Sequence, residues 1–296
     1  MPVRITQSML SERFLADYQA ALRRIARAEE QLATGRKVVR PSDDPVIALR
    51  ALRTESLLRD VAQFRRNADY ARSFLDAQER SLAEGEDLLK RVRELLVQGA
   101  NTALSAEARD AVASELRAVR EQFAAVANTN LGGRYAFSGE ATTEPAYGPS
   151  GLLDIPPAQR PLVAALSPGV SLPLGVTAVE LFRPTPGGED LFRFLERAED
   201  VIRTGGDVGA VLGDFEAFED NWLRWHTYVG SLQNRLELMA SRLESQAVSA
   251  EKLLSETADT DLAEAVTRLM TAQNVYQAAL GVGARILLPS LADFLR

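Results

Sequence analysis

The feature that most constrains the fold is a long apolar stripe after Pro45, in which apolar residues recur at alternating spacings of four and three. Gln78 and Gly85 occupy the two stripe positions that are not apolar. This heptad pattern is typical of a helix packed along its length on other helices. It predicts a helix from Pro45 to Gln98, about 80 Å long at a rise of roughly 1.5 Å per residue. The apolar members are Leu57, Val61, Phe64, Ala68, Ala71, Leu75, Leu82, Leu89, Val92 and Leu96.

Stripes with the same character occur at both ends of the chain. Ser105 is the expected N-cap of a helix, and the stripe of that helix is Val112, Leu116, Val119, Phe123 and Val126. The N-terminal segment carries Phe14, Tyr18, Ala21, Ile25, Ala28 and Leu32. The C-terminal third carries two such stripes. The first consists of Trp225, Val229, Leu232, Leu236, Met239, Leu243, Ala250 and Leu253. The second consists of Leu262, Val266, Leu269, Tyr276, Leu280 and Leu287. We therefore expect the two chain ends to pack on each other as one helical bundle.

The middle of the chain has a different pattern. Gly132 and Gly133 interrupt the helical periodicity, and Tyr135 and Phe137 then alternate as in a strand. Proline and glycine clusters at 145–157 and 168–175 separate the short apolar runs LVAAL and GVTAVELF. This pattern predicts a small β-rich domain, followed by a short helix at roughly 189–203.

The expected fold is mainly α with a small β-rich insertion, and its main body is a long antiparallel, coiled-coil-like helical bundle built from both chain ends. We expect residues 1–44 and 257–296 to form terminal helical segments. Residues 45–134 and 189–256 would form a domain of long helices, and residues 135–188 the small β-rich domain.

The segment GRKVVRPSDDP at 35–45 places two carboxylates, Asp43 and Asp44, directly before Pro45. Proline suits the first turn of a helix, where its missing N–H would be unpaired anyway. The residue before proline is held out of the α region, as an N-cap must be. We interpret Asp44 as the N-cap of the long helix, with Asp43 near the positive end of its dipole. A catalytic or metal role is less favoured, because no other polar groups converge there.

Composition and the N-terminal sequence exclude several classes of protein. The net charge of −7 and the pI near 5.1 give no electrostatic support for a nucleic-acid partner. Without cysteine there are no disulfides and no thiol chemistry. The N-terminus lacks the apolar region of a secretory signal, and no apolar run approaches the roughly 18 residues that cross a bilayer. Taken alone, these absences favour a cytoplasmic protein without membrane insertion.

No segment has the pattern of a catalytic or cofactor site. His226 is the only histidine, which excludes histidine-based metal clusters and triads; we interpret it as a packing or surface residue. Residues 130–133 lack the spacing of a phosphate loop. The acidic run at 259–264 lacks the glycine and the terminal glutamate of a calcium loop. We expect no catalytic residue, no cofactor and no metal.

Several ordered motifs resemble the flagellin superfamily. They are QLATGRKVVRPSDDPVIALRALR at 31–53, GRYAFSGEAT at 133–142, DLAEAVTRLMTAQNVYQAAL at 261–280 and SLADFLR at 290–296. The PSDDPV form and the SLADFLR ending resemble the hook–filament junction members of the superfamily more than its filament subunits. The middle of the chain matches no motif of the family.

The resemblance implies a structural protein of the bacterial flagellum, not an enzyme, whose terminal helices self-assemble. In this superfamily the terminal helices line a hollow axial structure, the long helices form the next shell, and the β-rich part faces outward. The resemblance also implies type III export to the extracellular flagellum without a cleaved signal peptide. The implied partners are further copies of the chain in a ring or helical assembly, hook-associated protein 1 on the hook side, flagellin on the filament side, and an export chaperone before secretion.

On this interpretation the chain ends become ordered when neighbouring copies supply apolar surface, because isolated helices are marginal in water. A filament-forming flagellin is one alternative, which copy number would distinguish. A cytosolic coiled-coil adaptor is a weaker alternative, since it explains the heptads but not the family motifs. The expected contact residues are Phe14, Tyr18, Ile25, Leu32, Leu269, Tyr276, Leu280, Leu287, Leu291 and Phe294.

Overall fold

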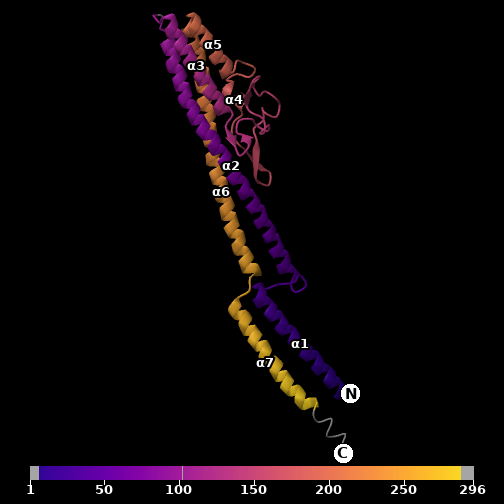
Figure 1. The fold of residues 1–296 in the computed structure, drawn as a ribbon. Helices are drawn as coiled ribbons and strands as arrows, with labels where there is room; N and C mark the ends of the chain where they lie inside the picture. Colours follow the sequence, from indigo (N-terminus) through magenta and orange to yellow (C-terminus); the bar gives the residue numbers. More distant parts are fainter. Residues whose placement is uncertain (1–6, 102, 288–296) are drawn as a thin grey trace, which may run out of the picture. The chain divides into compact units, whose positions relative to one another are not determined.

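The computed structural model describes residues 7–101 and 103–287 and is mainly helical (Figure 1). The chain forms two compact units. Unit 1 comprises Met1–Asp60 and Gln246–Arg296, and unit 2 comprises Val61–Ser245. The expected fold class, long helices packed from both chain ends with a small β-rich insertion, is confirmed.

Helices form the scaffold of unit 2. The long helices α2 (Pro45–Gly99) and α6 (Val208–Ala258) contribute residues to both units, whereas α3 (Ala106–Ala127) and α5 (Leu191–Thr204) lie within unit 2 and pack on each other. Ser105 caps α3, because its hydroxyl oxygen accepts the N–H of Ala108 at 3.2 Å. Helix α5 ends at Thr204, and the next residue, Gly205, caps it with a φ of 73°, the left-handed geometry that favours glycine.

The predicted stripes of unit 2 face its core. All five apolar stripe positions of α3 are buried. In α2 the stripe positions from Val61 to Leu96 are buried, apart from the half-buried Phe64. In α6, Val229 and Leu232 are buried as well. The heptad spacing therefore identified the core faces of these helices correctly.

The two stripe positions of α2 that are not apolar have separate packing roles. The side chain of Gln78 is 1% exposed. Its amide nitrogen donates to the carbonyl oxygens of Ala136 (2.6 Å) and Val176 (3.0 Å). Its amide oxygen accepts the backbone N–H of Val176 at 3.0 Å. Gly85 faces Trp222, whose indole N–H donates to the carbonyl oxygen of Leu82 at 2.9 Å. Gln78 thus fastens the insertion to α2, and Gly85 leaves room for the indole to reach the helix backbone.

The insertion contains three antiparallel hairpins: β1 (Asn130–Leu131) with β2 (Arg134–Tyr135), β3 (Tyr147–Gly148) with β4 (Gly151–Leu152), and β5 (Val163–Ser167) with β6 (Val170–Pro173). The run LVAAL lies mostly on β5. The expectation of a β-rich segment is wrong for GVTAVELF, which contains the short helix α4 (Ala178–Phe182). The reason is a capping box: the Thr177 hydroxyl accepts the N–H of Glu180 at 3.4 Å, and the Glu180 carboxylate accepts the N–H of Thr177 at 3.0 Å.

Unit 1 contains the antiparallel pair of α1 (Gln7–Thr34) and α7 (Leu262–Leu287), which lie side by side (Figure 1). The predicted stripe of α1 faces α7: Ala21 and Ala28 are buried and its other members half-buried. The predicted seam of α7 is wrong in part, because Leu262, Val266 and Leu280 are 59%, 40% and 44% exposed. The inward face instead carries Ala265, Leu269, Ala272, Tyr276 and Ala279. Since α7 is apolar on more than one side, periodicity alone selected a neighbouring face.

Candidate assembly surface

The two segments that join the long helices to the terminal helices are hydrogen-bonded to each other. The N–H of Lys37 donates to the carbonyl oxygen of Ala258 at 2.7 Å, and the N–H of Thr260 donates to that of Gly35 at 2.8 Å. Gly35 has a φ of 68°, which makes glycine the favoured residue at this turn. The Lys37 ammonium also donates to the carbonyl oxygen of Glu256 at 3.0 Å. Both chain ends therefore leave the long helices at one backbone-bonded joint.

The two aspartates at this joint have structural contacts. Helix α2 begins at Pro45, and Asp44 Oδ1 accepts the backbone N–H groups of residues 46 and 47 at 2.9 and 3.0 Å. Asp43 Oδ2 accepts the N–H of Arg40 at 3.3 Å. These are the contacts of a helix N-terminus and of the turn before it.

Aromatic residues fill the seam between α1 and α7 towards the chain termini. The hydroxyl groups of Tyr18 and Tyr276 are hydrogen-bonded at 2.8 Å, and their ring centroids are 5.2 Å apart. The ring of Phe14 lies 6.3 Å from that of Tyr18 and faces Gly283, where a methyl group would come within 2.6 Å of the Phe14 ring. The hydrogen bond from Tyr18 raises the pKa of Tyr276 above its ordinary value. Neutral phenols therefore hold this end of the pair together.

The predicted contact residues fall into three groups: one that is exposed, those at or beyond the end of α7, and those that are half-buried between α1 and α7. Leu280 is 44% exposed on α7. Leu287 is the last residue of α7, and Leu291 and Phe294 lie outside the described residues. The half-buried ones in the α1–α7 pair are Phe14, Tyr18, Ile25, Leu32, Leu269 and Tyr276.

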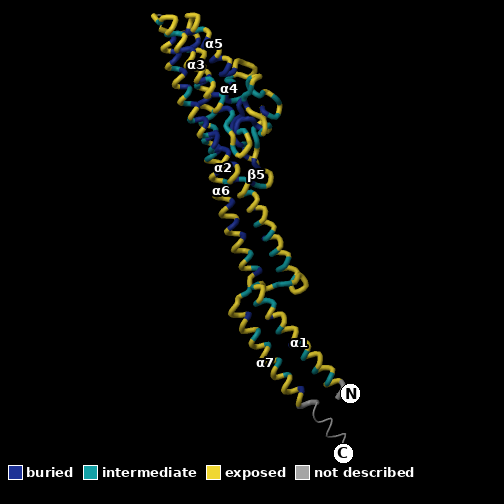
Figure 2. Tube along the Cα trace, viewed as in Figure 1, coloured by how far each residue is buried: buried dark blue, intermediate teal, exposed yellow. Residues whose placement is uncertain are grey.

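Unit 1 leaves most of its large apolar side chains in solvent, and Figure 2 shows α1 and α7 largely exposed. In the described part of unit 1, the fully buried apolar side chains are all alanines: Ala21, Ala28, Ala247, Ala250, Ala258 and Ala265. Sixteen large apolar side chains are exposed there: Met9, Leu10, Leu15, Leu22, Val46, Leu49, Leu52, Leu57, Val248, Leu253, Leu262, Val266, Met270, Val275, Leu280 and Val282. The described part of unit 2 exposes six: Tyr70, Val97, Val163, Val170, Leu223 and Leu238.

Sequence analysis missed most of this surface because it followed the seam positions. Residues such as Leu15, Leu22 and Met270 lie off the stripes and were left without a role. The available signal was the combination of two features, an alanine-rich stripe and leucines or valines on the other faces of the same helix. Such a helix cannot bury its apolar residues against one partner only.

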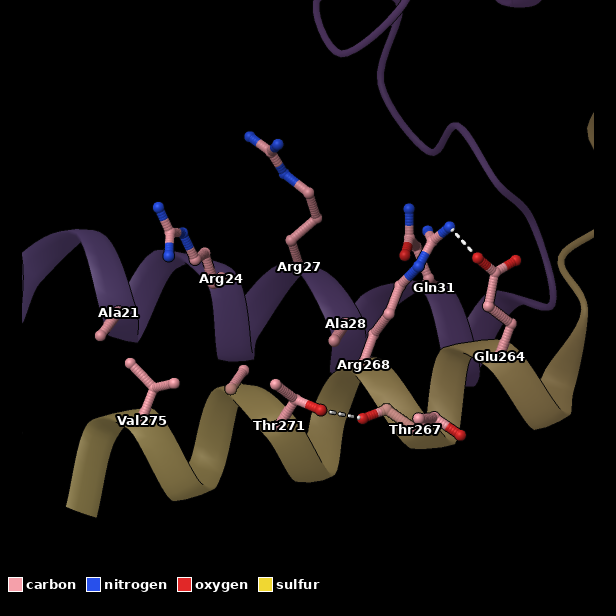
Figure 3. A pocket seen from close by; sticks show the side chains of 11 residues that line it. Ala21, Arg24, Arg27, Ala28, Gln31, Glu264, Thr267, Arg268, Thr271 and Val275 are labelled. Carbon is pink, nitrogen blue, oxygen red and sulfur yellow. Dashed lines mark hydrogen bonds and ion pairs between the residues drawn. The ribbon is translucent and has the colours of Figure 1, made fainter. Parts of the chain in front are cut away.

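A groove of about 630 Å³ runs along the α1–α7 pair (Figure 3). Its floor is made of small side chains, including Ala21, Ala28 and Ala272. Figure 3 shows Arg24 and Arg27 extending from α1 away from α7. The α1 side of the groove is thus cationic, whereas on α7 Arg268 is paired with Glu264 at 2.5 Å. The floor can be approached closely because alanine side chains are short.

No group of three or more His, Asp and Glu side chains among the described residues could hold a metal ion. His226 Nδ1 lies 3.6 Å from the carboxylate of Glu86 in unit 2 and is half-buried. Within 7–101 and 103–287, no helix combines the length and the apolar character that spanning a membrane requires.

These features define a class of protein: a helical structural subunit whose two chain ends form one antiparallel pair with an uncovered apolar surface. Comparison with known families then identifies the particular family. Residues 5–142 match the bacterial flagellin N-terminal helical region, and residues 223–289 match the bacterial flagellin C-terminal helical region. The chain belongs to the flagellin family, as the sequence motifs predicted, and is a structural protein of the bacterial flagellum, not an enzyme.

Individual relatives come from two groups within this family. The chain is 25% identical over 214 residues to flagellar hook-associated protein 3 of Salmonella typhimurium, covering 68% of this chain and 67% of that protein. It is 27% identical over 247 residues to the flagellar filament 31.3 kDa core protein of Treponema maltophilum, covering 81% and 80%. Its fold is similar to a putative flagellar hook-associated protein from Vibrio parahaemolyticus, with a TM-score of 0.66, 23% identity, and coverage of 73% of this chain and all of that one.

Proposed function

We propose that this protein forms the junction between the hook-side protein and the flagellin filament, by self-assembly through its chain ends. The observation that carries the proposal is the uncovered apolar surface of unit 1, whose buried apolar side chains are alanines. A junction position, as opposed to another place in the flagellum, is supported by the similarity to hook-associated protein 3.

Burial of this surface supplies enough free energy for association. Each Leu, Val or Met side chain that becomes buried contributes about 1.5–3 kcal/mol. Association costs on the order of 4–15 kcal/mol in lost rotational and translational freedom. These side chains are 37–60% exposed, so each would add about half of that contribution. Burial of all sixteen would contribute roughly 12–24 kcal/mol, so most of this surface has to be covered for association, which requires several neighbouring copies.

The proposed arrangement follows the division of the chain. Residues 1–44 and 257–296 would line the interior of the assembly, residues 45–134 and 189–256 would form the next shell, and residues 135–188 would face outward. The groove with its alanine floor would accept a helix from a neighbouring copy. Because the groove and the exposed leucines are different surfaces, such contacts are head-to-tail and propagate instead of closing as a dimer.

The proposed partners are further copies of the chain, hook-associated protein 1 on the hook side and flagellin on the filament side. An export chaperone would cover the apolar chain ends before type III export to the extracellular flagellum. The proposed contact residues on the described helices are Phe14, Tyr18, Ile25, Leu32, Leu269, Tyr276 and Leu280, and Leu287, Leu291 and Phe294 extend this set at the C-terminus.

Immuno-electron microscopy of isolated flagella tests the proposal. Label is expected only at the boundary between hook and filament. A strain lacking the protein is expected to make hooks without attached filaments and to release flagellin into the medium. Normal attached filaments in that strain would refute the junction role.

A filament subunit is the second candidate. The relative from Treponema maltophilum, a filament core protein, matches a larger share of this chain than the hook-associated relative does. In that case the antibody would label the whole filament, and each flagellum would contain thousands of copies instead of one ring.

A further inference from the structure

Tyr18 and Tyr276 come from opposite ends of the chain and are in direct contact. Their hydroxyl oxygens are 2.8 Å apart, and their ring centroids are 5.2 Å apart with an angle of 34° between the ring planes. Because the hydroxyl groups are closer to each other than the ring centres, the two rings converge at their hydroxyl edges. The ring carbons next to each hydroxyl are the carbons at which phenoxyl radicals couple. Both side chains are half-buried, so small oxidants can reach them.

We propose that Tyr18 and Tyr276 are an oxidative cross-linking site, at which a one-electron oxidant joins α1 to α7 through dityrosine. A haem peroxidase intermediate or a photo-oxidised metal complex belongs to this class of oxidant. The product links the two chain ends of one subunit by a carbon–carbon bond.

The chemistry balances with two equivalents of the oxidant. Each phenol gives up one electron and its hydroxyl proton, which produces two phenoxyl radicals. The radicals combine at the ring carbons next to the oxygens, so that one C–C bond forms. The hydrogen on each of these carbons then moves as a proton to the oxygen, which restores two phenols. In total two C–H bonds are lost, two electrons reduce the oxidant, and two protons go to solvent.

The position of this pair distinguishes it from the other tyrosines. Among the described aromatic contacts, Tyr70 meets Phe74, Tyr147 meets Phe192 and Tyr228 meets Trp225. Phenylalanine gives no phenoxyl radical, and a product of Tyr228 with Trp225 would stay within one helix. The chain has no cysteine. Dityrosine is therefore the covalent route that the geometry offers between α1 and α7.

The link would change the behaviour of the single subunit. Alanines are the apolar side chains that the described part of the α1–α7 pair buries fully, and its large apolar side chains are half-buried or exposed, so packing holds the pair weakly. A covalent bond between residues 18 and 276 keeps the helices together when they open, because it closes a long loop in the open state. An oxidised subunit would thus retain its paired ends outside the assembly.

The test uses the purified full chain at low concentration, oxidised with a photo-activated ruthenium complex and persulfate. Dityrosine fluorescence is expected in the monomer band on a denaturing gel. After trypsin digestion, mass spectrometry should find peptide 14–23, FLADYQAALR, joined to peptide 269–285, LMTAQNVYQAALGVGAR, with the loss of two hydrogens. Cross-linked chains should also lose their terminal helices to protease several times more slowly than unmodified chains.

Two conservative variants serve as controls. Tyr18→Phe and Tyr276→Phe keep the ring packing and remove one phenol each, so both should lose the 14–23 to 269–285 product. Tyr70→Phe removes a tyrosine of unit 2 and should leave the product unchanged. The proposal is overturned if the wild-type chain yields no such product, if the dityrosine appears only in dimers, or if either of the first two variants still forms it.

Discussion

Replacement of Gly85 by alanine tests the packing of α2 on α6 most directly. A methyl group at this position would lie 2.6 Å from Cη2 and 2.8 Å from Cε2 of Trp222, well inside van der Waals contact. The indole cannot simply move away. It is 1% exposed, lies edge-on to Phe123 and Phe182 at 5.8 and 5.4 Å, and donates its N–H to the carbonyl oxygen of Leu82.

The expected loss of stability is the balance of three effects. Overpacking of a filled core costs about 1–3 kcal/mol. A displaced indole N–H without a partner costs about 1–3 kcal/mol more. Alanine gains about 1 kcal/mol over glycine in a helix interior. Gly85→Ala should therefore lower the free energy of unfolding of unit 2 by about 1–5 kcal/mol. Its midpoint temperature should fall by roughly 2–4 °C for each kcal/mol.

Thermal and urea unfolding followed by tryptophan fluorescence measures this change, because Trp222 and Trp225 both belong to unit 2. Gly213→Ala is the matched control. It lies inside α6 with no atom near its missing side chain, and should stabilise by about 0.5–1 kcal/mol.

A double-mutant cycle with Trp222→Leu isolates the overlap between the two positions. In that background, followed by circular dichroism, the cost of Gly85→Ala should largely disappear. The reasoning is refuted if Gly85→Ala unfolds no earlier than the wild-type chain, or if its cost is unchanged when Trp222 is leucine.

Three further changes probe the polar network of unit 2 and the assembly surface. Gln78→Leu leaves the backbone N–H of Val176 without its buried partner, and should cost about 1–3 kcal/mol and speed hydrogen exchange in the insertion. Burial alone would raise the pKa of Glu199, but hydrogen bonds from Arg117 and Arg203 lower it below its ordinary value. Stability from this carboxylate is therefore present above its unfolded pKa of about 4.3 and is lost as pH falls below it. Glu199→Gln should flatten that part of the stability–pH curve in acid titrations. Leu280→Asp should leave monomer unfolding unchanged and abolish filament attachment in motility assays. Leu238→Asp, at a position that is also exposed to solvent but belongs to unit 2, should not abolish attachment.

Heptad spacing predicted the helices and core faces of unit 2 because their partners lie within the same chain. Along α3 and along α2 from Val61 onward, the apolar stripe and the buried face coincide, and the two stripe positions that are not apolar have a packing reason. The stripe residue Leu57, in unit 1, is 37% exposed. What spacing could not supply was the identity of the contacts. For example, Gly85 of α2 makes room for the indole of Trp222 in α6, and these two positions are far apart in the sequence. Local periodicity carries no information about such pairs.

The errors occurred where local chemistry or a missing partner decides the structure. The run GVTAVELF falls in the predicted β-rich region because proline and glycine clusters bound it, but the capping box of Thr177 and Glu180 starts a helix there. In α7 several faces are apolar, and the pattern alone could not say which of them meets α1. The structure uses the face of Ala265 and Tyr276 and leaves that of Leu262 and Leu280 uncovered.

The sorting of side-chain sizes between the units explains how one chain can be both a stable subunit and an assembling one. Unit 2 buries Trp222, Phe123 and other large side chains, each of which contributes several times the stabilisation of a buried alanine methyl group. Unit 1 buries alanines, which bring α1 and α7 close together but add little apolar burial. Larger residues at those seam positions would stabilise the α1–α7 pair of an isolated subunit. They would also push the two helices apart and fill the groove beside Ala21 and Ala28. Small seam residues thus leave the α1–α7 pair weakly packed and its groove open, so that in the proposed assembly its stabilisation would come from contacts between copies.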